Sequence, residues 1–333
     1  MFEIPIVLFI FKRPDKTIQI LNHISKIKPS TIYIIGDGPR NINEREIVLS
    51  CRKSVEANIP SNCKLVTNYA SENRGVYENI AGGAKYVLSL EKWAIFLEDD
   101  NLPEISFFRF CKELLYKYEK DNRILWICGT TYLKEYNFPD KASYGFTQNM
   151  MPCGWASWAD KFNQYYDGNL NLWKIPHIKD LIKSLPYDKK LKRQDMDNWD
   201  MELQHFKRFG RFASWDYQMS FSLRVHNLFG IVPKYNQITN IGVDMNSIHG
   251  GTTYDNEMTR RFCGLPTKEI EFPLAHPVSI IPYHDYETKV GHIITLPWRM
   301  RCKKNIARVI KRLFKINPFD SITETLKIKL KIK

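Results

Sequence analysis

The sequence predicts an α/β protein built on a mostly parallel β-sheet with helices on both sides, followed by a basic helical tail. Three observations lead to this prediction. Short apolar runs rich in strand formers alternate with segments of helical spacing through the first 128 residues, polar residues follow each run directly, and Lys and Arg concentrate after residue 296. Strand–helix alternation with short links is typical of a doubly wound parallel sheet with right-handed crossovers.

The elements of the first half can be assigned in order. Five apolar runs are too short for helices and indicate buried strands at 4–11, 31–35, 63–67, 93–97 and 124–128. Helical spacing lies between them at 15–27 and 43–57, in a segment ending near residue 90, and at 104–119.

The second half is less regular. Its sequence predicts a helix over 201–209 that stops at Gly210, and another over 214–228 with Ser214 as its N-cap. Short strands are expected at 231–233 and 238–241. The chain therefore divides into 1–130, 131–296 and the tail 297–333.

The tail carries most of the net charge. Residues 297–333 hold twelve of the 49 Lys and Arg but only two of the 36 Asp and Glu, so the tail contributes +10 of the formal +13. A nearly neutral body argues against a nucleic-acid groove, and the basic tail favours an anionic surface.

Residues 301–314 form a basic amphipathic helix in this reading, with an apolar face of Cys302, Ile306, Val309, Ile310, Leu313 and Phe314. Such a helix can lie on anionic lipid or pack on its own domain. Residues 326–333 alternate apolar and basic side chains, which predicts an edge strand or an irregular end.

The compartment follows from cysteines and hydropathy. The seven cysteines are scattered without a CxxC pair, which is typical of reduced thiols rather than of a disulfide framework or a zinc site. We identify no signal peptide and no stretch long enough to span a bilayer. These features predict a cytoplasmic protein whose tail contacts the inner face of the membrane.

Three acids, Glu98, Asp99 and Asp100, follow the apolar run 93–97. Ligands of open α/β sheets bind at the carboxyl ends of strands. Adjacent buried carboxylates repel one another, and Mg²⁺ or Mn²⁺ would relieve that repulsion through oxygen ligands. The alternative is that the acids only complement the dipole of the next helix.

Polar residues follow the other strands as well. Arg13 comes after the first, Asp37 after the second, and Asn73 with Arg74 after the third, so these side chains should meet the acids at one edge. Asp37 can accept a hydrogen bond from a nucleotide base, and Arg13 can face phosphate. Asp37-Gly38 is otherwise an ordinary turn, and each arginine alone is otherwise a solvated surface residue.

Two features of the second half bear on an acceptor. Trp155 and Trp158 can stack on sugar rings, or one or both can pack in the core. Asp216 falls in the first turn of a helix, where the dipole favours the ionised carboxylate of a general base, or serves only the helix. A separate acidic group is interpreted as a solvated charged loop: Asp195, Asp197, Asp200 and Glu202.

Taken together, five segments resemble glycosyltransferases of the GT-A fold, which use nucleotide sugars and carry a DxD-type acidic motif. The segments are 5–14, the Asp37 turn, 96–100, 153–158 and 214–218, and the resemblance covers about residues 4–245. It is strongest to bacterial family-2-like transferases and to the inverting N-acetylglucosaminyltransferase that begins complex N-glycans. It implies that 1–130 binds the nucleotide sugar and that 131–296 binds the acceptor.

The resemblance also implies roles for single residues. Asp100 would coordinate Mn²⁺ or Mg²⁺, Glu98 and Asp99 would bind ribose or sugar hydroxyls, and Asp37 would read uracil. Asp216 would be the catalytic base, although the base of the eukaryotic relative can align with the next residue instead. Related bacterial enzymes carry a histidine near His249, which implies a contact with the diphosphate or the metal; the alternative is that His249 is an ordinary loop residue.

The sequence thus predicts a metal-dependent inverting glycosyltransferase of the hexosyl or N-acetylhexosaminyl class. The donor would be a nucleotide sugar, with UDP favoured, and the acceptor a glycan or lipid-linked glycan in bacterial surface polysaccharide synthesis. Two alternatives stay open: a non-catalytic glycan- or membrane-binding protein with a vestigial site, and a sugar nucleotidyltransferase. The second would need a Gly-rich basic loop after the first strand, and residues 12–14 are not one.

Overall fold

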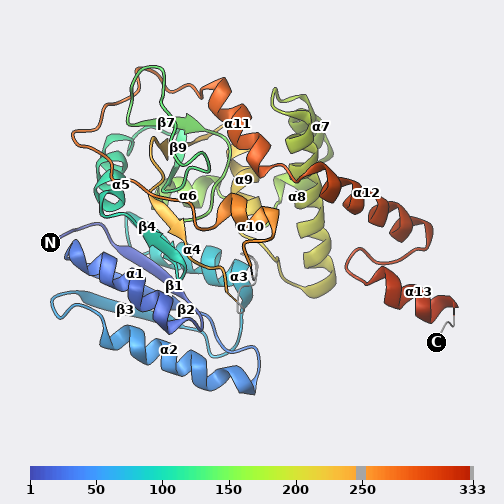
Figure 1. The fold of residues 1–333 in the computed structure, drawn as a ribbon, viewed down its shortest axis with the longest axis horizontal. Helices are drawn as coiled ribbons and strands as arrows, with labels where there is room; N and C mark the ends of the chain where they lie inside the picture. Colours follow the sequence, from blue (N-terminus) through green and yellow to red (C-terminus); the bar gives the residue numbers. More distant parts are fainter. Residues whose placement is uncertain (245–252, 331–333) are drawn as a thin grey trace.

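The structure is a computed structural model that describes residues 1–244 and 253–330 (Figure 1). Its main sheet has eight strands in the order β3-β2-β1-β4-β8-β6-β9-β7. Only β8 and β7 run antiparallel to the other six. The predicted fold class, a mostly parallel α/β sheet flanked by helices, is confirmed. The strands are β1 (Ile6–Ile10), β2 (Thr31–Gly36), β3 (Lys64–Tyr69), β4 (Trp93–Glu98), β6 (Ile124–Cys128), β7 (Tyr144–Thr147), β8 (Trp155–Trp158) and β9 (Phe229–Pro233).

Alternating side chains of the strands build a core on each face of the sheet. In β1, Ile6 and Leu8 enter one core, whereas Val7 and Phe9 enter the other. Because successive side chains of a strand point to opposite faces, a strand that is apolar throughout must be covered on both sides. One core is covered by α1 (Pro14–Lys26), α2 (Arg45–Ala57) and α5 (Ile105–Lys117), and the other by α4 (Gly83–Leu88), α6 (Ala159–Tyr165) and α9 (Asp216–Val225).

The remaining helices connect these layers or lie outside them. They are η1 (Ile42–Glu44), α3 (Gly75–Tyr77), the π-helical turn η2 (Glu78–Gly82), η3 (Leu172–Lys174), α7 (Pro176–Ser184), α8 (Lys189–Phe209), α10 (Glu257–Phe262), α11 (His284–Ile294), α12 (Trp298–Leu313) and α13 (Ile322–Leu330). In Figure 1, α12 and α13 lie beyond α8, on the opposite side of the molecule from α1 and α2.

Most predicted elements are present, with three differences at their ends. Helix α8 begins at Lys189 rather than near 201, because Asp188 caps it by accepting from two main-chain amides, and it ends at Gly210 (φ 71°) as predicted. Helix α9 begins at Asp216 and ends at Val225, short of 228. The alternating segment that begins at 326 is helical through Leu330, so the prediction of a strand or irregular end is wrong there.

A second, two-stranded sheet connects the two halves of the chain. β5 (Asn101–Pro103) pairs antiparallel with β10 (Ile238–Asn240) directly after the acidic triplet. The main-chain N–H of Ile241 donates to the Asp100 carbonyl (2.8 Å), and that of Gly154 donates to Asn101 Oδ1 (2.9 Å). This small sheet therefore fixes the backbone that follows β4.

The tail contacts α8 through an ion pair and through an aromatic side chain. None of the residues of α12 is buried, and its apolar residues Trp298, Ile306, Val309 and Leu313 are all more than half exposed. Arg308 pairs with Asp197 of α8 at 2.6 Å, and Phe319 packs on His205 and Phe209. In the parts of the chain that the structure describes, no helix is long and apolar enough to cross a bilayer.

Candidate active site

Strand register brings the predicted residues to one edge of the sheet. Phe9 of β1 lies opposite Glu98 of β4, Ile10 opposite Gly36 of β2, and Gly36 opposite Tyr69 of β3. The polar residues that follow these positions therefore emerge together at the carboxyl ends of four adjacent parallel strands. This confirms the shared edge that the sequence predicted.

Arg13 lies among carboxylates at this edge. Its Nη1 is 3.0 Å from Asp100 Oδ2 and 3.4 Å from Asp99 Oδ1, and its Nε is 3.8 Å from Asp244 Oδ2. Lys16 of α1 also pairs with Asp244. Arg13 is therefore no solvated surface residue, and its cation offsets much of the repulsion among the acids.

The acids are strongly perturbed by their surroundings. Burial, with the charge of Asp100 next in size, raises the pKa of Asp99 to about 7. Burial together with the charges of Asp100, Asp99 and Asp216 raises the pKa of Glu98 well above its usual range. Perturbed acids in a shared site are a functional signal, although ion-pair networks produce them too.

The donors present fit a hard divalent cation only in part. Within the described residues no three His, Cys, Asp or Glu side chains form a ready coordination cluster. Mg²⁺ and Mn²⁺ sites that also use substrate phosphates need only one or two carboxylates, which Asp99 and Asp100 can supply. A Cβ at position 242 would collide with Asp100 Oδ2, so Gly242 leaves the space beside that oxygen open. The metal role of Asp100 stays a prediction, and His249 lies outside the described residues.

Asp37 is occupied by its own loop. Its carboxylate accepts four hydrogen bonds from described residues: the amides of Gly38 and Arg74 (both 2.8 Å), the amide of Gly75 (3.2 Å) and Asn73 Nδ2 (2.8 Å). The residue is only 6% exposed. A carboxylate has about four acceptor positions, so this geometry makes Asp37 an anchor of the loop 73–75.

Arg74 is placed by the same loop but directs its side chain elsewhere. Its Nε and Nη2 donate to Asn79 Oδ1 at 3.1 and 2.9 Å, and Nη1 lies 3.4 Å from Asn68 Oδ1. These hydrogen-bond partners are neutral; burial lowers the pKa of the Arg74 guanidinium, and the nearby charge of Asp37 partly opposes that effect. Asn73 is committed to Asp37 and to the Gly38 carbonyl.

Asp216 occupies the first turn of α9, as predicted, and is held there by two neighbours. Ser214 Oγ donates to Asp216 Oδ1 and accepts weakly from the Tyr217 amide (3.3 Å). The buried Glu202 of α8 accepts from the amides of Ala213 (3.0 Å) and Ser214 (3.1 Å) through Oε2. The negative charge of Asp216 helps to raise the pKa of Glu98, so the two carboxylates share one region.

The prediction that Trp155 and Trp158 stack on an acceptor sugar is wrong. Both side chains are 1% exposed in β8, so no ligand can reach their faces. Trp155 stacks on Phe96, with ring centroids 3.9 Å apart, and Trp158 Nε1 donates to the Leu115 carbonyl (2.9 Å). They belong to the core, which was the alternative reading.

The interpretation of the acids at 195–202 as a solvated loop is also wrong. All four lie on α8, and Asp195 and Glu202 are buried. Burial raises the pKa of Asp195 to about 7, partly opposed by the charge of Arg224. Asp195 and Glu202 face the core, whereas Asp197 pairs with Arg308 of α12 and Asp200 pairs with Lys179 of α7.

Sequence reasoning missed the roles of three residues that the fold brings to the site. Asp244 joins Arg13, Asn240 Nδ2 lies 3.3 Å from Asp100 Oδ1, and Glu202 supports the segment before Asp216. Asp244 follows the last predicted strand, 238–241, which is the signal that marked Asp37 and Asn73, whereas Asn240 lies within that strand. Glu202 carried no such signal, because it lies within a helix.

The sequence matches no protein-family model and no curated protein. Among solved structures, a mannosyltransferase, PcManGT from Pyrobaculum calidifontis in complex with GDP-Man and Mn²⁺, is similar with a TM-score of 0.36 and 10% identity, over 67% of this chain and 68% of that chain. Mouse xyloside xylosyltransferase 1 gives a TM-score of 0.34 and 10% identity, over 68% of this chain and 84% of that one.

A UDP-glucose pyrophosphorylase complexed with UDP-glucose gives a TM-score of 0.33 and 9% identity, over 71% of this chain and 93% of that one. At these low TM-scores the similarities decide neither the activity nor the ligand of this chain. The fold class rests on the sheet order and register described above.

Proposed function

We propose that this chain is a glycosyltransferase that moves a sugar from a nucleotide sugar to a hydroxyl of a glycan or lipid-linked glycan. The observation that supports it most directly is the meeting of two kinds of carboxylate at one sheet edge. Asp99 and Asp100 are paired with Arg13, whereas Asp216 begins a helix near Glu98. Glycosyl transfer needs charge stabilisation on the leaving diphosphate and a base for the acceptor hydroxyl.

The donor side of the site consists of Arg13, the acidic triplet and the loop held by Asp37. In the proposal Arg13 binds the diphosphate, and Glu98 and Asp99 bind ribose or sugar hydroxyls. Mn²⁺ or Mg²⁺ held by Asp100 would neutralise part of the charge that develops on the leaving group. The loop 73–75 contacts the nucleotide, a UDP group by resemblance, while Asp37 holds the loop in shape.

The acceptor side is Asp216. Its carboxylate takes the proton of the acceptor hydroxyl while the hydroxyl oxygen bonds to the anomeric carbon and the bond from that carbon to the diphosphate oxygen breaks. The nucleoside diphosphate leaves on the opposite face, so the anomeric configuration inverts. Asp216 lies in the first turn of α9 and accepts a hydrogen bond from the Ser214 hydroxyl, which orients its carboxylate.

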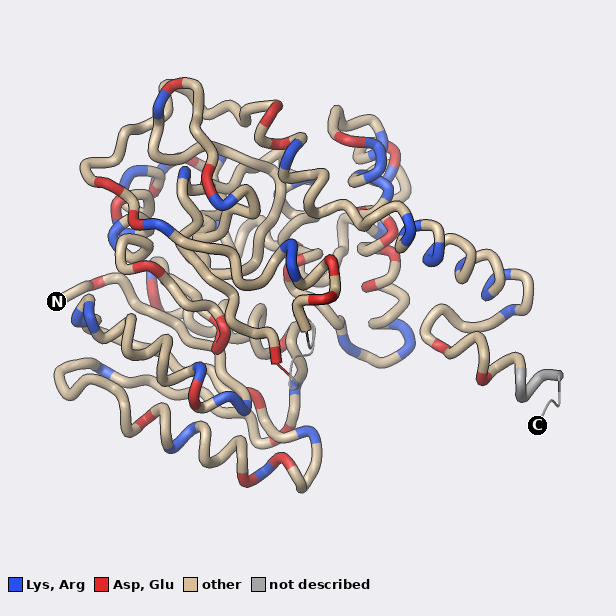
Figure 2. Tube along the Cα trace, in the orientation of Figure 1, with Lys and Arg blue, Asp and Glu red and all other residues tan. Residues whose placement is uncertain are grey.

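Features of the tail favour an acceptor that is associated with a membrane. The exposed apolar residues of α12 (Trp298, Ile306, Val309 and Leu313) recur at helical spacing, and the tail carries most of the net charge. Figure 2 shows Lys and Arg repeated along α12. An exposed apolar stripe beside basic groups fits an anionic membrane surface, with about 1 kcal/mol per basic group near the lipid. In this proposal the enzyme transfers a hexosyl or N-acetylhexosaminyl group. The acceptor is a glycan of bacterial surface polysaccharide synthesis.

The test is turnover of a panel of nucleotide sugars with and without Mn²⁺, followed as release of nucleoside diphosphate. We expect Asp100→Ala and Asp216→Asn each to lower turnover at least about a hundredfold. Nucleotide affinity, measured by calorimetry, should weaken much more in Asp100→Ala. Glu46→Ala, an exposed acid on α2, is the control and should behave as wild type.

Three results would contradict the proposal. Equal loss of nucleotide affinity in both variants would refute the assigned roles. Nucleotide binding without turnover of any nucleotide sugar would favour a vestigial site. Formation of a nucleotide sugar from a nucleoside triphosphate and a sugar 1-phosphate would favour a nucleotidyltransferase.

A further inference from the structure

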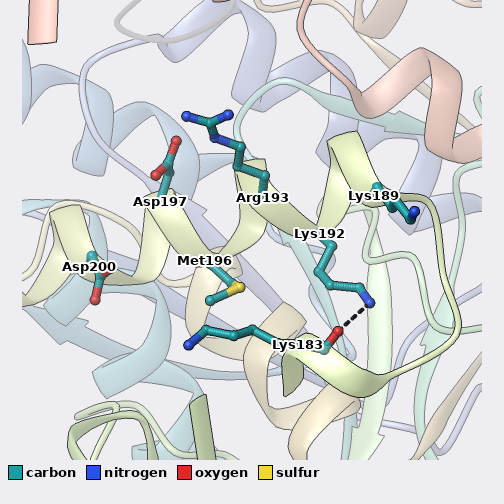
Figure 3. A pocket seen from close by; sticks show the side chains of 7 residues that line it. All are labelled: Lys183, Lys189, Lys192, Arg193, Met196, Asp197 and Asp200. Carbon is teal, nitrogen blue, oxygen red and sulfur yellow. Dashed lines mark hydrogen bonds between the residues drawn. The ribbon is translucent and has the colours of Figure 1, made fainter. Parts of the chain in front are cut away.

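A groove lies between α7 and α8, outside the candidate active site (Figure 3). Its cavity is about 470 Å³. Seven side chains line it: Lys183, Lys189, Lys192, Arg193, Met196, Asp197 and Asp200. We call it the α7–α8 groove. Four of the seven are cationic, whereas none of the sequence motifs pointed to this place.

Cations from outside the groove offset both of its carboxylates. Asp197 pairs with Arg308 of α12 at 2.6 Å. Asp200 pairs with Lys179 at 2.8 Å and also accepts from Trp173 Nε1 (2.9 Å). The two acids are therefore not available to neutralise the four cations that line the groove.

Those cations are largely uncompensated. Lys192 Nζ donates to the Lys183 carbonyl (2.7 Å), a neutral partner, and Lys183 pairs with the exposed Asp180. Within the described residues, Lys189 and Arg193 form no ion pair with a carboxylate within 4.0 Å, and both are exposed. The groove thus presents positive charge, which suits the oxygens of a phosphate group, with Arg193 pointing to the other side of α8 from Lys183 and Lys192 in Figure 3.

The groove lies beside the tail at two places along α8, one near Asp197 and one at the start of the helix. The Arg308–Asp197 pair joins its wall to α12. At the start of α8, a smaller cavity of about 190 Å³ brings Lys190 together with Trp298 and Arg301 of α12. A phosphate group in the groove would therefore lie beside the helix whose apolar residues remain exposed.

We propose that the α7–α8 groove binds the phosphate-bearing headgroup of an anionic phospholipid, while α12 contacts the acyl-chain boundary. This inference rests on the membrane contact proposed above for the tail, and it adds a headgroup site on the body of the protein. A lipid is favoured over a free anion because three of the four cations, Lys183, Lys189 and Arg193, are exposed. Each gives a weak contact alone, and a membrane presents many headgroups together with an apolar layer.

The experiment is vesicle flotation of the full chain with phosphatidylcholine vesicles that contain increasing fractions of phosphatidylglycerol. The test variant combines Lys189→Glu with Arg193→Glu. The control combines Lys26→Glu with Lys53→Glu, which makes the same charge change on exposed positions of α1 and α2, far from α8 in Figure 1. We expect the groove pair to lose at least about tenfold in vesicle affinity and the control to lose less than about twofold.

Further measurements distinguish the ways in which the proposal could be wrong. Equal loss in both pairs would mean diffuse attraction and overturn the groove site. A thermal shift with inorganic phosphate alone that the groove pair abolishes would assign the groove to a free anion and overturn the lipid. If Ile306→Asp with Leu313→Asp abolishes flotation and the groove pair does not, the membrane contact stands and the groove site falls.

Two controls complete the design. Lys189→Ala with Arg193→Ala repeats the test without adding negative charge, and far-UV circular dichroism checks the fold of each variant. Release of nucleoside diphosphate is measured on the same samples. If wild type turns over a nucleotide sugar but does not float, the membrane contact and the groove site both fall, whereas the catalytic proposal survives.

Discussion

Replacing Asp37 by alanine tests whether this carboxylate anchors a loop or reads the nucleotide base directly. The substitution removes the acceptor of four hydrogen bonds, three of them from main-chain amides that follow β2 and β3. The donors are left in a nearly buried place, because the Asp37 side chain is only 6% exposed.

The magnitude follows from those contacts. A hydrogen bond to an ionised group contributes about 1.5–3 kcal/mol net, so the two 2.8 Å bonds from the amides of Gly38 and Arg74 give about 3–6 kcal/mol. Water can reach the partly exposed end of the loop at Arg74 and Gly75. We therefore expect Asp37→Ala to lower the free energy of unfolding by about 3–4 kcal/mol.

The assay combines urea denaturation with calorimetric titration of UDP and GDP. If Asp37 only positions the loop, Asp37→Ala should weaken both nucleotides by a similar factor while stability falls. Asp37→Asn, which keeps the shape and one acceptor oxygen, should recover part of both losses. If Asp37→Ala keeps wild-type stability but loses affinity for UDP far more than for GDP, the anchoring argument is refuted. Direct recognition of uracil by Asp37 would then be favoured.

Three further predictions concern buried groups outside the acidic triplet. Glu202→Gln weakens the hold on the segment before Asp216, so turnover should fall about tenfold to a hundredfold with donor affinity unchanged, and a loss of donor affinity would contradict this. Asp195 keeps its proton in the folded state between its usual pKa of 3.8 and about 7, so its contribution to stability falls as pH rises through that window. Asp195→Asn should flatten the fall, which is up to about 4 kcal/mol, and parallel urea curves for wild type and variant across pH 4–8 would refute it. Trp155→Ala should cost about 3–5 kcal/mol of stability as a core truncation, and a raised acceptor KM at unchanged stability would contradict its burial.

The sequence predicted the strand-end geometry well because one rule governs it. An apolar run such as 93–97 must be buried on both faces, and the residues that follow parallel strands must emerge at the same edge. That rule placed Arg13, Asp37 and Asp99 in one region without knowledge of any contact. The strand at 238–241 was predicted, but the three-residue β5 left no periodic signal, so the pairing of β5 with β10 was not predicted.

Side-chain partners could not be predicted in the same way. Whether Asp37 faces a ligand or its own backbone depends on the path of the loop 73–75, which local sequence does not fix. The burial of Asp195 and Glu202 depends on how α8 packs. Because α8 is mostly polar, its sequence does not indicate which positions are buried. The exposure of the apolar residues of α12 was open for the same reason, since an amphipathic pattern does not identify what covers it.

Trp155, one of the two tryptophans that were expected at the acceptor, connects the two halves of the site instead. Phe96 lies two residues before Glu98 in β4 and stacks on Trp155, and Trp155 lies 5.4 Å, centroid to centroid, from Trp215. Trp215 directly precedes Asp216, and its carbonyl accepts from Tyr166 Oη (3.0 Å). This buried row of rings fixes the start of α9 relative to the end of β4. Two carboxylates that are far apart in sequence are therefore held in register by packing, which is the precision that a base and a leaving-group site require of each other.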